Sequence, residues 1–374
     1  MRGLYLHIPF CEHKCIYCDF YSIEQTGGID AFADMLRKEI EMTAAVTDND
    51  LMYTSVFFGG GTPSLLTPGQ LQKIMDTLHR EFNIVPDAEF TVETNPGTAD
   101  RTKLREYKSV GVNRLSIGVQ SFVADDLEFL TRIHSVHDAE RCYQDARNAG
   151  FDNINIDMMF SLPTHNKARW LQNIDRVISL APDHISAYSL TYEEGTPLHT
   201  MLKKNEVIPL PDEIDAELYE LTIDSFESAG YEHYEISSYA QPGKKCLHNR
   251  TYWEYYEYLG FGPSAHSFMN GKRFWNEKNL QGYTKQIGRG VIPVAGEEVL
   301  TDIQRAEEEI FLGLRTSGVD LKKIKNFYKL DLLQEKTSEI TSFSERGLII
   351  VDNGYLRLTK QGKAYADMIA SELM

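Results

Sequence analysis

The chain is short of positive charge and of long apolar runs. Its 374 residues include 38 Lys and Arg against 55 Asp and Glu, which gives a formal net charge of −17. A surface with this average charge repels a phosphate backbone, and no dense basic run offsets it. We therefore expect no nucleic acid among the partners. No apolar run approaches the length of a membrane-spanning helix.

Cysteine is also scarce, and its distribution is uneven. Only five cysteines occur, and three of them fall within the segment CEHKCIYC, residues 11–18. The first apolar stretch, LYLHIPF, is too short for a secretory signal and contains a histidine. Clustered thiols in a chain without an export signal favour a reducing, cytoplasmic setting and a role in metal binding or catalysis. The isolated Cys142 is expected to be a small buried helix residue.

What the sequence does contain is a regular alternation of strand and helix patterns over its first 240 residues. Six short apolar or β-branched runs cover residues 4–8, 55–58, 89–94, 114–119, 153–160 and 184–190. Segments with helical spacing follow them, near 30–40, 68–82, 100–110, 136–149, 167–180 and 212–229. This pattern predicts an α/β fold with a parallel sheet, arranged either as an open doubly wound sheet or as a complete or partial barrel.

Polar and glycine-rich motifs stand just after the predicted strands. CEHKCIYC follows the first strand, GGGTPS the second, ETNP the third, VQSF the fourth and SLP the fifth. Both candidate architectures bind ligands at the carboxyl ends of their strands. The sequence therefore predicts one functional site, built from several strand ends.

From about residue 301 the pattern changes. Helical stretches near 302–315, 320–328 and 330–345 precede LIIVDNGYLRLT, in which Asn353-Gly354 predicts a two-residue hairpin turn. With a final helix, this order resembles a small winged-helix module. Residues 301–374 carry 11 Lys and Arg against 12 Asp and Glu, which favours packing or docking over DNA binding. We predict domains at 1–240 and 301–374, joined by a linker segment at 241–300.

Cys11, Cys15 and Cys18 have the spacing C-x3-C-x2-C. A structural zinc ion takes four ligands, and His7 or His13 could supply the fourth. A four-iron cluster also normally takes four thiolates, so three leave one iron open to an external molecule. Both interpretations remain open on the spacing alone.

The cysteine motif, with Tyr17 before its third cysteine, resembles that of the radical S-adenosylmethionine enzymes. The resemblance implies a partial (β/α)6, TIM-like barrel and a [4Fe–4S] cluster whose open iron is chelated by S-adenosylmethionine, which is cleaved to a 5′-deoxyadenosyl radical. Polar residues at strand ends, such as Glu93, Gln120 and Asp157, suit such a ligand, and Arg132 could meet its carboxylate. By the resemblance, the contacts to S-adenosylmethionine are Tyr5, Tyr17, Gly60, Gly61, Thr62, Glu93, Gln120, Arg132 and Asp157.

Over essentially the whole chain, LYLHIPFC, GGGTPS, LSIGVQSF and YEISSYA resemble the group of oxygen-independent coproporphyrinogen III oxidases. Two departures point away from the oxidases themselves. Their fourth cysteine is replaced here by Phe20, and only ten residues precede Cys11, where the oxidases carry a long extension. Both features resemble the related HemW-type heme chaperones.

The segment CLHNRTYW, residues 246–253, also resembles the heme chaperones. By the resemblance, its heme-binding residues are His248, Asn249, Arg250, Tyr252 and Trp253. Chemically, an imidazole can ligate heme iron, an arginine can pair with a propionate, and aromatic faces can pack on a porphyrin. The alternatives are an aromatic-rich packing loop with a hydrogen-bonded histidine, or Cys246 as the metal ligand.

We therefore predict a cytoplasmic heme chaperone that binds a [4Fe–4S] cluster, S-adenosylmethionine and heme. Its expected partners are heme or a porphyrin, a heme-accepting protein such as a membrane-bound respiratory protein, and a second copy in a homodimer. One alternative is a coproporphyrinogen III dehydrogenase that forms protoporphyrinogen IX. A second is a zinc-stabilised interaction protein. Ser161, in SLP, stands where relatives usually have glycine, which alters a turn.

Overall fold

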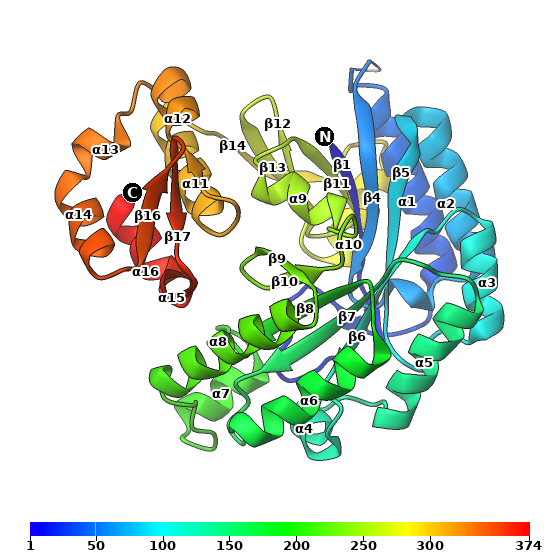
Figure 1. Cartoon of the computed structure of the whole chain (residues 1–374). Coiled ribbons are helices and arrows are strands. Elements are labelled where there is room, and N and C mark those ends of the chain that lie inside the picture. The colour runs from blue at the N-terminus through cyan, green and yellow to red at the C-terminus, as the bar shows by residue number, and fades with distance from the viewer. Residues whose placement is uncertain (49) are drawn as a thin grey trace.

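A computed structural model describes residues 1–48 and 50–374 and shows a large curved sheet surrounded by helices, with a smaller C-terminal module beside it (Figure 1). Six parallel strands form the centre of the sheet and neighbour one another in this order: β1 (Gly3–Ile8), β4 (Met52–Gly60), β5 (Asn83–Thr94), β6 (Arg114–Gln120), β7 (Ile154–Phe160) and β8 (His184–Ser189). The six predicted strands and their parallel arrangement are confirmed. The sheet is not closed into a complete barrel.

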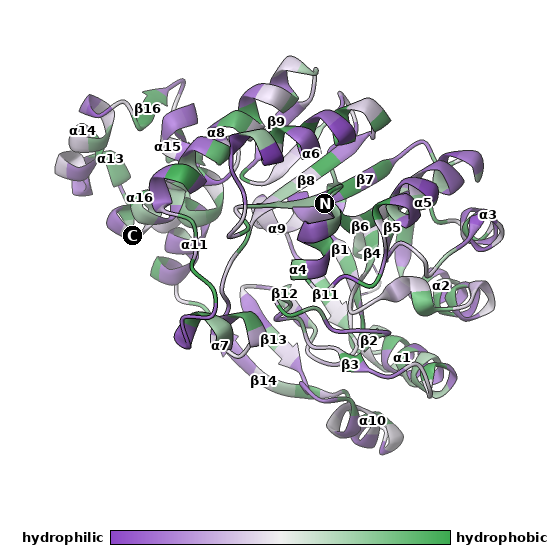
Figure 2. Ribbon diagram, turned by 90° about the horizontal axis from the view of Figure 1, so that it is seen from below, coloured by the Kyte–Doolittle hydropathy of each residue, from purple (hydrophilic) through white to green (hydrophobic). Residues whose placement is uncertain are grey.

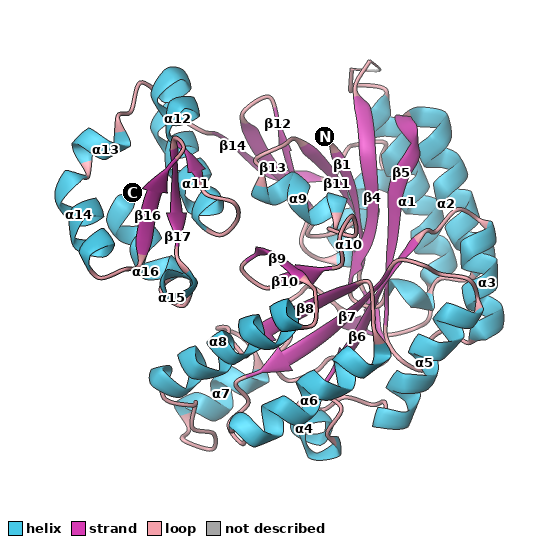
Figure 3. Ribbon diagram, viewed as in Figure 1, coloured by secondary structure: helices cyan, strands magenta, loops and turns pink. Residues whose placement is uncertain are grey.

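One long helix follows each central strand and packs on the outer face of the sheet (Figure 3). These helices are α1 (Ile29–Ala44), α2 (Pro68–Glu81), α3 (Arg101–Ser109), α5 (Val136–Asn148), α6 (Lys167–Leu180) and α8 (Asp212–Ser228). Shorter elements lie in the loops: β2 (Phe10–Cys11), β3 (Ile23–Glu24), η1 (Pro63–Leu65), α4 (Ala124–Phe129) and α7 (Pro197–Lys203). Cys142 is buried in α5, as predicted.

Helix α2 shows why these segments are helical. Thr67 accepts a hydrogen bond from the backbone of Gln70, whose side chain bonds back to Thr67, and Pro68 occupies the first turn. The apolar residues that follow at helical spacing, Leu71, Ile74, Met75 and Leu78, are all buried against the sheet. Figure 2 shows the same mixture of hydrophilic and hydrophobic residues on the other outer helices.

The two faces of the central strands differ in chemistry. Alternate residues such as Leu4, Val56, Val92, Leu115 and Ile156 join the apolar core under the helices. Because side chains alternate along a strand, the residues between them face the inside of the partial barrel, and many of those are polar. They include Ser55, Glu89, Thr91, Glu93, Arg114, Ser116, Asn155, Asp157, His184 and Ser186. The interior is therefore packed with polar side chains and is not a second apolar core.

The segment 241–300, predicted as a linker, differs from that prediction because it contributes four strands to the main sheet. Strand β11 (Tyr258–Phe261) pairs in parallel with β1, and β12 (His266–Met269), β13 (Lys272–Asn276) and β14 (Val294–Val299) extend the sheet antiparallel from it. These strands satisfy the backbone groups of β1 that would otherwise be unpaired. The same segment contains α9 (Leu247–Trp253) and α10 (Leu280–Gly288). At the other edge lie β10 (Ser238–Ala240) and β9 (Glu232–Glu235).

The C-terminal module has its own apolar core. It consists of α11 (Asp302–Leu314), β15 (Val319–Asp320), α12 (Leu321–Tyr328), α13 (Leu332–Glu335), α14 (Thr337–Glu345), β16 (Ile349–Asp352), β17 (Tyr355–Leu358), α15 (Lys360–Lys363) and α16 (Ala366–Leu373). The predicted hairpin turn is present, with φ of 51° at Asn353 and 84° at Gly354. None of the described helices is both long and apolar enough to cross a membrane.

Candidate functional site

The three clustered cysteines lie in the loop after β1, at the carboxyl edge of the sheet. Cys11 and Cys15 are buried and Cys18 is partly buried, and all three are free thiols. Burial raises the pKa of Cys18 to about 11, and the neighbouring Cys15 and Cys11 add to the rise. The Cys15 and Cys11 thiols therefore lie close enough to Cys18 to act on its pKa.

The two histidines considered as a fourth zinc ligand are both engaged elsewhere. His7 Nε2 lies 2.8 Å from the carbonyl oxygen of Tyr21, and its Nδ1 lies 3.1 Å from the hydroxyl of Tyr5. His13 Nε2 lies 3.2 Å from the hydroxyl of Thr131. Within residues 1–48 and 50–374, no group of three or more His, Cys, Asp or Glu side chains could hold a metal ion as the side chains stand. Cys11, Cys15 and Cys18 are among the side chains so described, so the hydrogen bonds of His7 and His13 are the observation that argues against zinc.

The glycine loop after β4 packs directly on the cysteine loop. The backbone N–H of Gly61 donates to the carbonyl of Ile8 at 2.8 Å, and that of Thr62 donates to the carbonyl of Phe10 at 2.7 Å. A Cβ on Gly61 would lie 2.6 Å from the Phe10 carbonyl oxygen and 3.1 Å from Cys11 Sγ. Gly60 has a φ of +107°, which is left-handed and suits glycine. The close approach of the two loops therefore requires glycine.

A hydrogen-bond bridge connects two of the cysteines. The Thr62 hydroxyl donates to Cys11 Sγ at 3.4 Å, and it accepts from Asn95 Nδ2 at 2.9 Å. Arg132 donates through one terminal nitrogen to Asn95 Oδ1 at 2.8 Å, and through the other to Cys15 Sγ at 3.5 Å. Thr62 and Arg132 were predicted site residues. Asn95 was not, although ETNP stood among the strand-end motifs.

These residues fit an anionic sulfur cluster. Hydroxyl and guanidinium donors point at two of the three cysteine sulfurs, and such donors stabilise thiolates that carry negative charge. Arg132 Nε is buried and has no hydrogen-bond partner among the described residues, which leaves one donor for a ligand beside Cys15. A small cavity of about 20 Å³ lies here, lined in part by Cys15, Thr62, Asn95 and Arg132.

Of the remaining residues predicted to contact S-adenosylmethionine, Glu93 and Gln120 lie at the carboxyl ends of β5 and β6, whereas Tyr5 and Asp157 stand in the middle of β1 and β7. Glu93, one residue before the end of β5, accepts a hydrogen bond from the Gly60 backbone at 3.2 Å. Enclosure by protein raises the pKa of Glu93 to about 8, and the nearby Asp157 adds to the rise. Gln120 ends β6 with a left-handed φ of 69°, a strained conformation for this residue type. Burial raises the pKa of Tyr17, which lies beside Arg132.

The predicted heme motif lies away from the cysteine loop. Helix α9 places His248 against Gly3, the first residue of β1, and against Ser55 of β4. The cysteines follow the opposite end of β1. His248 is 1% exposed, and its Nδ1 and Nε2 lie 3.0 Å from the Ser55 hydroxyl and 2.8 Å from the Tyr252 hydroxyl. Burial lowers the pKa of His248 to about 3, so the imidazole is neutral at physiological pH.

A carboxylate fixes α9 in this position. Glu89 of β5 accepts hydrogen bonds from the backbone N–H groups of Leu247 and His248, both at 3.1 Å, and from the Cys246 thiol at 3.4 Å. Arg114 Nε lies 3.9 Å from the same carboxylate. Arg250 pairs with Glu254, the residue after α9, and Asn249, Tyr252 and Trp253 are each partly buried. In this arrangement α9 closes the amino end of the barrel interior.

Comparisons with known proteins identify relatives that match nearly the whole chain. Residues 5–177 match the Radical SAM superfamily, and residues 300–365 match the HemN C-terminal domain. The chain is 38% identical to the heme chaperone HemW of Bacillus subtilis over 97% of this chain and 96% of that protein. The chain belongs to the HemW family. This family member is also 38% identical to HemW of Escherichia coli K12, over 72% of this chain and 71% of that protein.

The fold of this HemW family member is also that of a solved structure. Coproporphyrinogen III oxidase (HemN) from Escherichia coli, described as a radical SAM enzyme, superposes with a TM-score of 0.85. The match covers 100% of this chain and 89% of the other, with 23% sequence identity, so it concerns the fold alone. A radical SAM fold implies a [4Fe–4S] cluster and S-adenosylmethionine as ligands.

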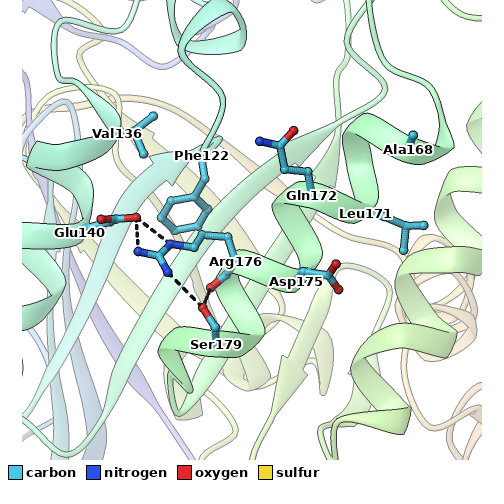
Figure 4. Close-up of a pocket in the computed structure, with 9 residues that line it drawn as sticks. All are labelled: Phe122, Val136, Glu140, Ala168, Leu171, Gln172, Asp175, Arg176 and Ser179. Carbon is cyan, nitrogen blue, oxygen red and sulfur yellow. Dashed lines mark hydrogen bonds and ion pairs between the residues drawn. The ribbon is translucent and has the colours of Figure 1, made fainter.

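A larger surface cavity of about 720 Å³ lies outside the barrel, between α5 and α6 (Figure 4). Phe122, Leu171 and Ala168 contribute its apolar lining, and Glu140 and Arg176 pair across it at 2.5 Å. None of the predicted site residues of this HemW family member lines it.

Proposed function

We propose that the protein is a heme chaperone, which binds heme and transfers it to a heme-accepting protein. The observation that supports this proposal best is the 38% identity, over nearly the full length, to a relative named heme chaperone HemW. Phe20, in place of the fourth cysteine of the oxidase motif, points the same way. The proposal also includes a heme-accepting protein, such as a membrane-bound respiratory protein. It further includes a homodimer and action in the cytoplasm.

In this proposal Cys11, Cys15 and Cys18 hold the [4Fe–4S] cluster. When bound, the cluster supplies an open iron and an electron for S-adenosylmethionine. The chain's own residues then position that molecule. The glycine loop at Gly60–Thr62 offers close backbone contacts, and Glu93 offers a carboxylate to its amino group. Arg132 has a free Nε–H for a carboxylate, because no described residue accepts from it.

Heme binding is proposed at α9, with His248 Nε2 as the iron ligand. That nitrogen now faces the Tyr252 hydroxyl at 2.8 Å, so iron has to displace the hydroxyl. The ring also stacks on Phe57, with centroids 4.9 Å apart, and is 1% exposed. A porphyrin reaches Nε2 only if α9 moves away from the barrel wall. The imidazole is already neutral, which is the form that ligates iron.

Two substitutions test the heme proposal in opposite directions. His248→Ala removes the ligand and should weaken heme binding at least tenfold in a spectroscopic titration. Tyr252→Phe keeps the ring but removes the hydroxyl that occupies Nε2, so heme should bind more tightly or faster. His165→Ala is a matched control, because His165 is also buried and bonds to Asp126 after β6 rather than to any residue of α9. Unchanged heme affinity in His248→Ala would exclude His248 as the ligand.

A separate assay distinguishes the chaperone from the oxidase. The protein is reconstituted anaerobically and incubated with coproporphyrinogen III, a reductant and S-adenosylmethionine. A chaperone leaves the porphyrinogen unchanged. Stoichiometric formation of protoporphyrinogen IX would instead establish the dehydrogenase reaction. Metal analysis of the same material should find iron and sulfide, and zinc in their place would support the interaction-protein alternative.

A further inference from the structure

The bridge from Cys11 to Cys15 passes through the side chain of Asn95. It lies in the loop between β5 and α3, where its backbone is held on both sides. The backbone N–H of Asn95 donates to the Ser64 hydroxyl at 3.3 Å, and its carbonyl accepts from the Thr98 hydroxyl at 2.7 Å. Gly118 leaves room for it, since a Cβ there would lie 3.0 Å from Asn95 Oδ1.

The chemistry of the neighbours fixes the orientation of the Asn95 amide. Arg132 can only donate hydrogen bonds, so the atom facing it at 2.8 Å must be the amide oxygen. The amide nitrogen then faces Thr62 Oγ1 at 2.9 Å and donates to it. Because Thr62 accepts from Asn95, its own hydroxyl proton is directed to Cys11 Sγ. The amide thus provides a donor on one side and an acceptor on the other.

We infer that Asn95 is a positioning residue that sets the reduction potential of the cluster, by holding Thr62 and Arg132 as hydrogen-bond donors to Cys11 and Cys15. Reduction adds an electron to the cluster and increases the negative charge on its sulfurs. Hydrogen bonds to those sulfurs therefore stabilise the reduced state and raise the potential. This inference rests on the cluster that forms part of the proposed function, and it goes beyond heme binding.

The most direct test is the Asn95→Asp variant, which replaces the amide nitrogen with a carboxylate oxygen and keeps the shape of the side chain. A carboxylate still accepts from Arg132, but it also accepts from Thr62, so the hydroxyl turns away from Cys11. The reduced-to-oxidised ratio of the cluster at a fixed potential should fall about tenfold, which is about 59 mV for a one-electron couple. The measurement is a redox titration of anaerobically reconstituted protein, followed by the paramagnetic signal of the reduced cluster.

A double-variant cycle separates the hydrogen-bond effect from the added charge. Thr62→Val alone removes the donor to Cys11 and should also lower the potential. In the Asn95→Asp background the hydroxyl is already diverted, so Thr62→Val should have little further effect. Asn113→Asp is the matched control. Asn113 bonds to the backbone of Ala88 and Phe90 in the same strand, far from the cysteines, so its substitution should leave the potential unchanged.

The outcomes are distinguishable. A wild-type potential in Asn95→Asp, or strictly additive shifts in the cycle, would overturn the inference and leave the proposed function standing. The inference is also overturned if the cluster is lost from all three of Asn95→Asp, Asn95→Ala and Thr62→Val but is retained in Asn113→Asp. Asn95 would then have a structural role, and the proposed function would still stand. A wild-type protein that binds neither iron nor sulfide would contradict the proposed function itself.

Discussion

Glu93 is a carboxylic acid held in an unusual protonation state by its surroundings. It lies at the end of β5, enclosed by protein and close to Asp157, and its pKa is raised from 4.5 to about 8. A carboxyl group kept partly protonated at neutral pH costs less to enclose than a charged one. A cationic amino group that binds beside it would lower the pKa again and release a proton.

This environment makes a prediction for stability against pH. The folded protein binds a proton at Glu93 that the unfolded chain loses above pH 4.5, so wild-type stability falls as pH rises from about 5 to about 8. Glu93→Gln does not titrate, so relative to wild type it should gain on the order of 2 kcal/mol across this range. Urea unfolding at pH 5.5, 7 and 8.5 measures the difference. A pH-independent difference between the two proteins would contradict the raised pKa.

The cysteines and the glycine loop could be recognised from the sequence because each of these motifs lies within a few consecutive residues. Cys11, Cys15 and Cys18 lie within one short segment, and Gly60 and Gly61 stand together after a strand. The role of Asn95 could not be recognised in this way. Its bridge depends on residues 33 positions before it and 37 positions after it, which only the folded sheet brings together. Ser161 has a left-handed φ of 59°, which accounts for the glycine that is usual at this position.

At the scale of elements, the loop after β1 and the loop after β4 form one unit. Their backbones bond to each other directly, and Gly61 sits at the point of closest approach. Any side chain there must push the Phe10 carbonyl and the Cys11 thiol away. The position of Cys11, a proposed cluster ligand, therefore depends on a residue that carries no functional group.

Gly61→Ala tests this dependence. The added Cβ, 2.6 Å from the Phe10 carbonyl oxygen, should lower the free energy of unfolding by about 1–3 kcal/mol and reduce the iron content after reconstitution. Gly69→Ala is the matched control, because nothing lies within 4 Å of a Cβ at Gly69 in the first turn of α2. That variant should be stabilised by about 0.4–1 kcal/mol. Equal stability of the two variants in urea unfolding would show that the loops can separate without cost.

The buried position of helix α9 could not be predicted from the sequence. The motif HNRTYW was visible as a chemical pattern, but its burial was not. His248 is fixed by Glu89, 159 residues earlier, and by Ser55, 193 residues earlier. The strand patterns in the sequence predicted the sheet. In strands such as RLSIGVQ, polar residues alternate with apolar ones, which indicates a polar interior. That alternation could have indicated that another segment docks there. No local pattern identifies which segment fills such an interior.

At the scale of the whole molecule, few polar contacts join the C-terminal module to the barrel. Glu308 of α11 accepts hydrogen bonds from Tyr255 and Arg273, both at 2.9 Å. Lys363 of α15 lies 2.9 Å from His233 Nδ1, at the β9 edge of the sheet. Tyr255 comes two residues after α9, so the module contacts the segment that contains the predicted heme motif.

Glu308→Ala should loosen this attachment. It leaves Arg273 and Tyr255 without their shared acceptor and should lower the free energy of unfolding by about 1–2 kcal/mol. Cleavage between the two parts by a protease should also become faster. Glu345→Ala, at an exposed position in α14, serves as the control and should change neither quantity. If the two variants unfold at the same urea concentration, the Glu308 contacts do not hold the module in place.

The sheet ends at β14, an outermost strand whose residues are almost all exposed. The unpaired backbone groups of an edge strand can hydrogen-bond with a strand of another chain, and repeated pairing of this kind builds fibres. Glu297 and Glu298 on this strand pair with Lys272 and Arg273 of β13, so the repelling charge is that of the whole chain, a net −17. Charge repulsion between copies of the chain therefore opposes polymerisation through β14. This repulsion disappears as the pH falls toward the isoelectric point near 5.1.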